Sequence, residues 1–152
     1  MKKKITVLFL CTGNSCRSQI AEGWTRHLKN DKITVYSAGI ETHGLNPNAV
    51  KVMADAGVDI SGHTSQNIDE FSDTPIDYVI TVCGHAHETC PFFPAECKVI
   101  HKGFDDPPKM AKELADKGAS ESEQLECYSS VRDQIRAFVE TLPESLEGGC
   151  NE

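Results

Sequence analysis

The sequence has no long apolar run, and this absence argues against a membrane protein. Its apolar stretches, such as residues 5–10, are far shorter than the ~20 residues that a membrane-spanning helix requires. The lysines at positions 2–4 precede only this short stretch, and no small-residue cleavage site follows. We therefore expect no signal peptide and predict a cytoplasmic protein without a membrane partner.

Basic residues are also scarce. The chain has 15 Lys and Arg against 23 Asp and Glu, which gives a net charge of −8 at pH 7. This balance argues against nucleic-acid binding, and it means that an anionic substrate is attracted only by a local site. Internal repeats, linkers and low-complexity segments are missing as well. We predict one domain over residues 1–143, a flexible acidic tail over residues 144–152, and a monomer.

Cysteine, by contrast, is abundant. Seven cysteines are present in the 152 residues. In a reducing compartment an odd, high count suggests catalysis or metal binding rather than a disulfide framework. Cys97, Cys127 and Cys150 belong to no recognisable group of chemical residues. The other four stand beside residues that can carry chemistry: Cys11, Cys16, Cys83 and Cys90.

Residues 11–18 read Cys-Thr-Gly-Asn-Ser-Cys-Arg-Ser, between an apolar stretch and a helical repeat. The stretch before them predicts a buried strand, and the spacing of Ile20, Trp24 and Leu28 predicts a helix that begins at about Arg17. The backbone N–H groups of such a loop can converge on a tetrahedral oxyanion at the helix N-terminus. The predicted anion-binding residues are Thr12, Gly13, Asn14, Ser15, Cys16 and Arg17.

Three side chains of this loop have predicted chemical roles. The guanidinium of Arg17 can hold two oxygens of the anion at once. Cys11 ends the strand beneath the anion, where the helix dipole and Arg17 favour the nucleophilic thiolate. Ser18 is placed to donate a hydrogen bond to that sulfur. The alternative is an ordinary strand-to-helix turn around a buried cysteine.

The order of elements predicts the fold class. Strands are expected at residues 5–10, 33–37, 77–82 and 98–100, with helices between them. Strands that alternate with helices imply an α/β, doubly wound parallel sheet. Because ligands bind at the carboxyl ends of such strands, Cys11 and Cys83 are expected at the same edge of the sheet.

Three helices are expected outside the loop region. Asn46 caps the first of them, Pro47 opens it and Gly57 ends it; its predicted inner face is Val50, Met53 and Ala54. A short amphipathic helix carries Met110, Ala111, Leu114 and Ala115 and ends near Gly118. A longer helix follows a capping box of Ser120 and Glu123. Its apolar stripe is interpreted as core: Leu125, Tyr128, Val131, Ile135, Phe138 and Leu142.

Cys83 and Cys90 bracket a polar segment that contains two histidines. Three interpretations remain open: two unrelated core cysteines, a zinc site that includes His85 and His87, or a redox pair. A zinc site has suitable ligands but tight spacing for one tetrahedron. A redox pair requires the segment to bring the two α-carbons within ~7 Å of each other.

Asp106 is the candidate general acid. It lies between Asp105 and Pro107, after the last predicted strand and therefore at the ligand-binding edge. A carboxyl group there can protonate a leaving oxygen, whereas the alternative for an Asp-Asp-Pro sequence is a simple turn. We interpret Asp105 as a supporting or capping group.

These residues together resemble the thioredoxin-coupled arsenate reductases, which share the low-molecular-weight tyrosine phosphatase fold. The resemblance covers residues ~4–108 and resumes at Val131-Arg132-Asp133. It implies a three-layer fold with a four-stranded parallel sheet flanked by helices. It also implies that Cys11 is the nucleophile, with Arg17 and Ser18 supporting it, that Asp106 is the acid, and that Cys83 and Cys90 are the redox pair.

The same resemblance implies a reaction and a partner. Arsenate would be reduced to arsenite by a three-cysteine relay, and thioredoxin would regenerate the enzyme without a further cofactor. Rival hypotheses are a phosphotyrosine phosphatase that uses a Cys11 phosphoenzyme, and a metal- or arsenite-binding module without turnover. Pro108 stands where the phosphatases usually have an aromatic residue, and a phosphatase has no need of Cys90.

The sequence departs from the family pattern at three places. Some members bind potassium at positions that match Asn14, Glu22, Ser37 and an aspartate; Gln66 stands at the last of these here. Because this substitution removes a charge, we expect no metal site. Lys102 precedes Gly103 where an aromatic residue is common. Residues ~108–122 are expected to be an insertion.

Overall fold

The computed structural model describes residues 4–14, 16–42, 44–71, 73–82 and 98–149. Its strands are β1 (Ile5–Cys11), β2 (Ile33–Gly39), β3 (Tyr78–Thr81) and β4 (Lys98–His101). They form a parallel sheet in the order β2-β1-β3-β4. Cys11 pairs with Gly39, and Leu10 pairs with Thr81, so these strand ends share one edge. The four predicted strands and their parallel arrangement are confirmed.

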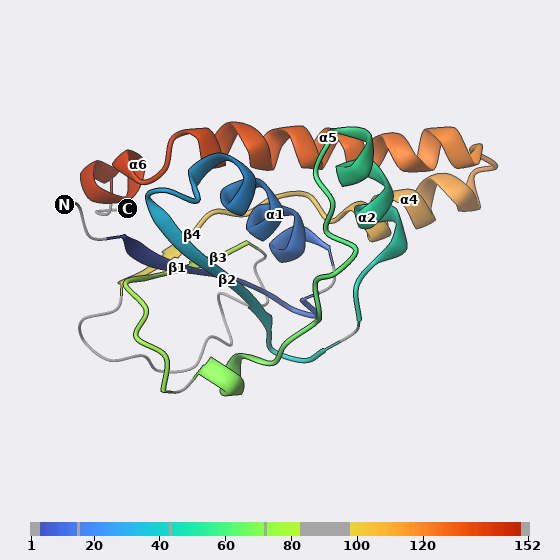
Figure 1. The fold of residues 1–152 in the computed structure, drawn as a ribbon. Helices are drawn as coiled ribbons and strands as arrows, with labels where there is room; N and C mark the ends of the chain where they lie inside the picture. The colour runs from blue at the N-terminus through green and yellow to red at the C-terminus, as the bar shows by residue number, and fades with distance from the viewer. Residues whose placement is uncertain (1–3, 15, 43, 72, 83–97, 150–152) are drawn as a thin grey trace.

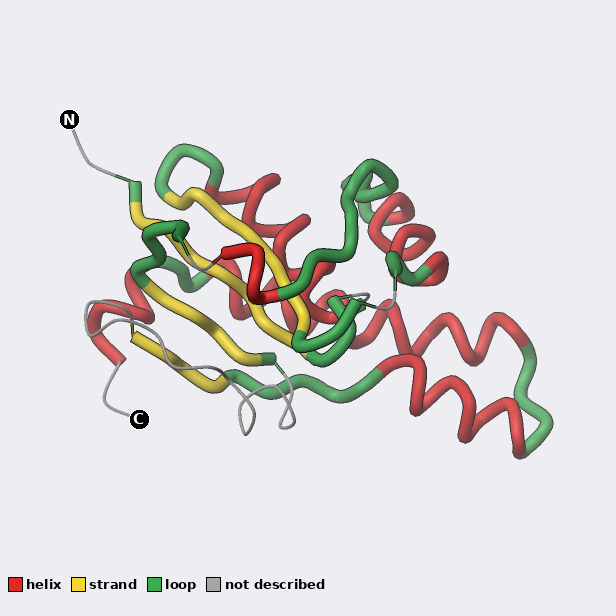
Figure 2. The backbone as a smooth tube through the Cα atoms, turned by 90° about the horizontal axis from the view of Figure 1, so that it is seen from below, coloured by secondary structure: helices red, strands yellow, loops and turns green. Residues whose placement is uncertain are grey.

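Helices α1 (Arg17–Lys29), α2 (Pro47–Asp55) and α5 (Glu121–Glu140) lie on one side of the sheet in Figure 1. The 3₁₀-helix η1 (Ile68–Phe71) lies on the other side, in front of the strands when the molecule is seen from below in Figure 2. Residues 7–10 of β1 are fully buried. Burial of consecutive residues requires cover on both faces of the strand, as the sequence predicts for a parallel sheet. No helix in the described part of the chain is long and apolar enough to cross a membrane.

Local signals account for where these helices begin. The side chain of Asn46 accepts hydrogen bonds from two backbone N–H groups at the start of α2, and Pro47 opens the helix. Gly57, at φ +89°, follows its end. The buried face of α2 is Ala49, Val52 and Met53, whereas Ala54 is exposed. The predicted inner face was therefore correct for Met53, and Val50 is partly buried against the core, but it was wrong for Ala54. The packing of α2 against α1 and α5 sets its rotation.

Helix α4 (Pro107–Asp116) and α5 form a helical hairpin that projects from the sheet, as Figure 1 shows. The predicted capping box at the start of α5 is present: Ser120 and Glu123 each accept from the other's backbone N–H group. The predicted core stripe is confirmed, with Tyr128, Val131 and Ile135 buried. Helix α4 begins at Pro107, so Asp106 immediately precedes a helix N-terminus.

The chain continues beyond Pro143 as a further helix, α6 (Glu144–Gly149). Leu146 on this helix is 2% exposed and belongs to the hydrophobic core. The prediction that the chain frays after Pro143 was therefore wrong for residues 144–149. Burial of this one leucine anchors a segment whose acidic, glycine-rich composition resembles a tail. The division of the chain at residue 143 into a domain and a tail remains a prediction.

Candidate active site

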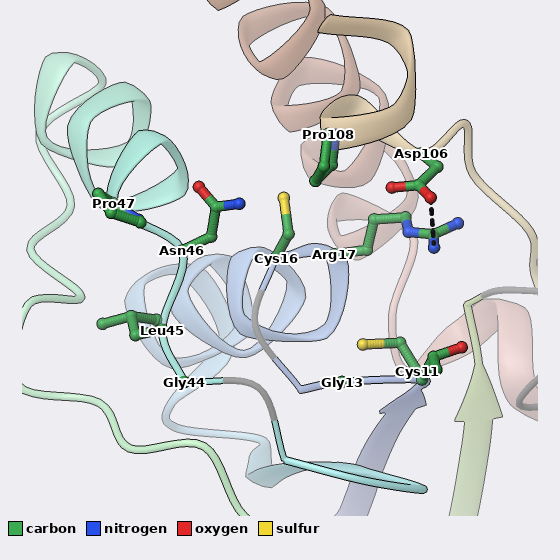
Figure 3. Close-up of a pocket in the computed structure, with 11 residues that line it drawn as sticks. Cys11, Gly13, Cys16, Arg17, Gly44, Leu45, Asn46, Pro47, Asp106 and Pro108 are labelled. Carbon is green, nitrogen blue, oxygen red and sulfur yellow. Dashed lines mark ion pairs between the residues drawn. The ribbon is translucent and has the colours of Figure 1, made fainter. Parts of the chain in front are cut away.

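Cys11 ends β1 and Arg17 begins α1, so the predicted anion-binding loop joins a central strand to a helix N-terminus. Figure 3 shows Cys11 at the strand end, with Arg17 and Asp106 above it. Cys11 is 4% exposed and lines a pocket. The residues that share this pocket come from three segments: Thr12, Gly13, Cys16 and Arg17; Gly44, Leu45, Asn46 and Pro47; Asp106 and Pro108. Ser15 lies outside the described residues.

The loop passes so close to β2 that only glycine fits at its neighbour Gly39. A β-carbon there would lie 2.7 Å from the backbone nitrogen of Asn14 and 2.9 Å from the carbonyl carbon of Gly13. Backbone hydrogen bonds from the two residues after Gly39 also hold the loop in place. The N–H of Ile40 donates to the carbonyl of Cys11 (3.2 Å), and the N–H of Glu41 donates to that of Thr12 (2.9 Å).

Asn14 holds the loop from within. It has φ +48°, a left-handed conformation that asparagine tolerates better than most residues, and it is fully buried. Its Nδ2 donates to the hydroxyls of Ser18 (2.9 Å) and Ser37 (3.0 Å). Its Oδ1 accepts from the backbone N–H of Gln66 (2.6 Å) and from Nε2 of Gln19 (3.2 Å). With these four hydrogen bonds, the Asn14 side chain fixes a strained turn in one conformation.

Ser18 and Cys11 form the predicted pair, with their Oγ and Sγ atoms 2.9 Å apart. Because Ser18 already accepts a hydrogen bond from Asn14, its own hydroxyl proton is available to the sulfur. A donor aimed at sulfur stabilises the thiolate relative to the thiol. The geometry therefore supports Cys11 as a nucleophile.

Arg17 connects the loop to the segment that carries the candidate acid. Its Nη1 donates to the carbonyl oxygen of Phe104 (2.9 Å), and its Nη2 lies 3.7 Å from Oδ2 of Asp106. The Arg17 side chain is only 14% exposed, so its charge lies in the pocket. Asp106 is the N-cap residue of α4 but makes no side-chain capping hydrogen bond, which leaves its carboxylate directed at the pocket. Asp105 is exposed and does not line the pocket.

Cys16 shares the pocket with Cys11 but differs from it chemically. Burial raises the pKa of the Cys16 thiol far above its ordinary value; the neighbouring Cys11 acts in the same direction, and Arg17 opposes both. Cys16 therefore remains a neutral thiol at physiological pH. Cys127 is buried on α5, outside this pocket. The predicted redox cysteines Cys83 and Cys90, and with them Cys97 and Cys150, lie outside the described residues, so the redox and zinc interpretations of that segment both remain predictions.

The residues that match a potassium site in some family members already have partners from within the protein. Glu22 accepts from the Ser37 hydroxyl (2.5 Å) and forms an ion pair with Nη2 of Arg26 (2.5 Å). The amide oxygen of Asn14 also has its partners, as described above. Within the described ranges no group of three or more His, Cys, Asp and Glu side chains could hold a metal. The protein's own Arg26 thus lies where a cation would balance Glu22.

Sequence reasoning missed several residues that shape the site. Gln19 bonds to Asn14 and to the carbonyl of Thr64, and the Ser65 hydroxyl donates to the carbonyl of Gly13. No local sequence pattern predicts these contacts, because the partners are backbone atoms or residues distant in the sequence. Arg26 had a signal, because it stands four residues after Glu22 on a predicted helix.

Comparisons with known proteins identify the family and several relatives of this chain. Residues 6–149 match the family described as low molecular weight phosphotyrosine protein phosphatase, which confirms the fold that the sequence implies. The arsenate reductase of Halalkalibacterium halodurans is 46% identical over 145 residues, which cover 95% of this chain and 99% of that protein. The arsenate reductase of Bacillus licheniformis is 49% identical over 147 residues, 97% of this chain and 100% of that protein.

A solved structure of an arsenate reductase in the phosphate binding state has a TM-score of 0.69 and 36% identity to this chain, covering 91% of it and 95% of the solved chain. These matches extend well beyond the loop and its supporting contacts, so they concern the whole domain rather than one motif. The chain therefore belongs to the low molecular weight phosphotyrosine protein phosphatase family, alongside relatives that are arsenate reductases.

Proposed function

We propose that this protein reduces arsenate to arsenite with three cysteines, Cys11, Cys83 and Cys90, and that thioredoxin regenerates it. The observation that carries the proposal is the Ser18–Cys11 pair beneath a loop and helix N-terminus suited to a tetrahedral oxyanion. The similarity to arsenate reductases over nearly the full chain gives the substrate class. A similar reductase is known in a phosphate binding state, and phosphate and arsenate are both tetrahedral oxyanions.

In the first step, arsenate binds against the loop N–H groups and the guanidinium of Arg17. The Cys11 thiolate attacks arsenic, a sulfur–arsenic bond forms, and one arsenic–oxygen bond breaks. Asp106 donates a proton to the departing oxygen, which leaves as water. Arg17, whose Nη2 lies 3.7 Å from Oδ2 of Asp106, stabilises the charge that develops on the oxygens.

In the second step, the Cys83 thiolate attacks the sulfur of Cys11. The electron pair of the sulfur–arsenic bond passes to arsenic, so As(V) becomes As(III) and arsenite leaves. A Cys11–Cys83 disulfide remains. Cys90 then attacks Cys83, which frees Cys11 and moves the disulfide to Cys83–Cys90. The dithiol of thioredoxin reduces this last disulfide, and because thiols supply both electrons the scheme uses no other cofactor.

The second candidate is a phosphotyrosine phosphatase, which the family match favours. The same loop and acid would form and hydrolyse a Cys11 phosphoenzyme. Pro108 lines the pocket at the position where the phosphatases usually present an aromatic ring to their substrate. We therefore rank this activity second.

One experiment separates these candidates. The purified protein is given arsenate, thioredoxin, thioredoxin reductase and NADPH, and arsenite is measured directly; a parallel reaction contains a phenyl phosphate ester. The proposal expects repeated arsenite turnover and at most weak ester hydrolysis, with both lost in Cys11→Ser. Ester hydrolysis without arsenite would support the phosphatase. Tight binding of arsenite without either turnover would support the binding module.

A further inference from the structure

We propose that Phe104 is a positioning residue for Arg17, because its aromatic ring fixes the backbone carbonyl that holds the guanidinium in place. This inference rests on the proposed function, in which Arg17 binds two oxygens of the substrate. Phe104 does not itself line the pocket. It therefore acts on the substrate through the residues that it holds.

The guanidinium of Arg17 has two contacts outside the loop, and they differ in strength. Its Nη1 donates to the carbonyl oxygen of Phe104 at 2.9 Å, whereas its Nη2 lies 3.7 Å from Oδ2 of Asp106, beyond hydrogen-bonding distance. The Asp106 side chain is also 42% exposed, so water screens its attraction. The hydrogen bond to Phe104 therefore fixes the plane of the guanidinium, and a planar fork binds two oxygens only when it is aligned with them.

The Phe104 carbonyl is held through both the backbone and the side chain of its residue. The Phe104 N–H donates to the carbonyl of Val82, the residue after β3 (3.2 Å). The Phe104 ring packs edge to face on Phe138 of α5, with ring centroids 6.1 Å apart and planes at 63°. Aromatic pairs of this geometry contribute more than the area that they bury. Phe104 thus links the edge of the sheet to α5 at the point where its carbonyl meets Arg17.

Lys102 adds a further contact to this aromatic pair. Its Nζ lies 5.5 Å from the centroid of the Phe104 ring and 5.9 Å from that of the Phe138 ring, within the range of a cation–π interaction. Lys102 is exposed, so this contribution is small. The residue that departs from the family pattern thus packs on the same two rings.

The neighbours of Phe104 provide little anchorage of their own. Between the end of β4 at His101 and the start of α4 at Pro107, the side chain of Phe104 packs against the hydrophobic core, whereas Gly103 and Asp105 are exposed. Loss of the Phe104 ring would therefore release the carbonyl from its fixed position. Arg17 would lose its alignment with the anion.

The test measures the binding of inorganic phosphate, which involves the loop and Arg17 but no chemical step. Phosphate in the loop shields Cys11 from alkylation by iodoacetamide, and the dependence of this protection on phosphate concentration gives a dissociation constant. We expect Phe104→Leu to weaken binding about tenfold, since a small misplacement of a substrate-positioning group has effects of this size or larger. Phe104→Tyr keeps the ring and should bind phosphate as the wild-type protein does.

Phe71 provides a matched control for the loss of an aromatic contact. Its ring is buried and packs on Tyr36 with centroids 5.3 Å apart, and it does not line the pocket. Phe71→Leu should lower the melting temperature and leave the dissociation constant of phosphate unchanged. An equal loss of phosphate binding in Phe71→Leu and Phe104→Leu would overturn the proposal. Phe138→Leu removes the same ring contact from the other side and decides the matter if Phe104→Leu does not fold.

A double-mutant cycle shows whether Phe104 acts through Arg17. Arg17→Lys has no planar fork to align, so the addition of Phe104→Leu to it should weaken phosphate binding much less than Phe104→Leu does alone. The same loss in both backgrounds would overturn the proposal.

These outcomes are separate from those of the proposed function, because protection by phosphate requires neither arsenate nor thioredoxin. The expected pattern in a protein that produces no arsenite supports the role of Phe104 and overturns the proposed function alone. Arsenite turnover with unchanged phosphate binding in Phe104→Leu overturns the role of Phe104 alone. If phosphate does not protect Cys11 even in the wild-type protein, Arg17 holds no anion there and the inference fails.

Discussion

The Cys11 side of the pocket and the Asp106 side are held in different ways. On the first side, Asn14, Ser18 and Ser37 are fully buried and joined by hydrogen bonds, and the loop packs against Gly39 with no room for a β-carbon. On the second, the Asp106 side chain is 42% exposed, makes no capping hydrogen bond, and lies 3.7 Å from Arg17.

This difference suits the tasks that we propose for the two sides. An oxyanion and a thiolate are stabilised by donors fixed before the substrate arrives, because donors that reorganise during the reaction lose part of their effect. A general acid exchanges its proton with water in each cycle and therefore benefits from access to solvent. Arg17 belongs to the fixed side but reaches the Phe104 carbonyl and Asp106, so it joins the two.

The largest effect is expected from Arg17→Lys. A lysine ammonium cannot replace a planar fork that holds two oxygens and the Phe104 carbonyl. We expect turnover to fall about 1,000-fold, near the upper range for loss of one oxyanion-stabilising group, and inhibition by phosphate to weaken with it. Arg136→Lys, on the outer helix α5, is the matched control. Near-normal turnover in Arg17→Lys would show that the backbone N–H groups suffice.

Asp106→Asn should have the next largest effect. Loss of a general acid lowers turnover by roughly 100-fold or more, while inhibition by phosphate should persist because the loop is intact. Steady-state kinetics of Asp106→Asn and Asp105→Asn test this together. Asp105 does not line the pocket, so its variant should retain activity. A large loss in Asp105→Asn with none in Asp106→Asn would mean that the wrong carboxylate was chosen.

Ser18→Ala should have a smaller effect. It removes one hydrogen bond to a charged sulfur, a contribution of about 1.5 kcal/mol or roughly tenfold in the rate of Cys11 alkylation at pH 7. Cys16 provides an internal control in the same peptide, since burial raises the pKa of its thiol and it should stay unmodified in both proteins. Equal rates of Cys11 alkylation with and without the hydroxyl would remove Ser18 from the mechanism.

Potassium is expected to have no effect on the stability of the protein, the smallest change among these predictions. Glu22 already has Arg26 as its counter-charge, and Gln66 offers no carboxylate. We expect equal melting temperatures in potassium chloride and sodium chloride at the same ionic strength. A rise of several degrees in potassium alone would show that Asn14, Glu22 and Ser37 bind the ion in spite of these contacts.

The two sides also differ in how much the sequence predicts. Signals that depend on neighbours in the chain were reliable: the apolar strand before Cys11, the helix that begins at Arg17, and the Asn46-Pro47 start of α2. The roles proposed for Ser18 and Asp106 rest on their positions relative to strand and helix ends. The structure places Ser18 next to the Cys11 sulfur and Asp106 at the pocket, and the roles themselves remain predictions.

Signals that depend on tertiary packing were missed. Nothing local shows that Glu22 is buried, and so its pairing with Arg26 reads as an ordinary surface contact. Leu146 is one apolar residue among glutamates and glycines, and only its place against the core makes α6 part of the fold. The rotation of the short α2 depends on the helices beside it, which hydrophobic spacing alone does not define.

The most direct test of the whole account is the fate of Cys90→Ser with arsenate. We predict that this variant releases about one arsenite per molecule and then stops, with or without thioredoxin. Peptide mapping should find a Cys11–Cys83 disulfide in the stalled variant and a Cys83–Cys90 disulfide in wild-type protein treated with arsenate alone. Sustained turnover of Cys90→Ser with thioredoxin, or stoichiometric zinc on Cys83 and Cys90 in active protein, would contradict the three-cysteine relay.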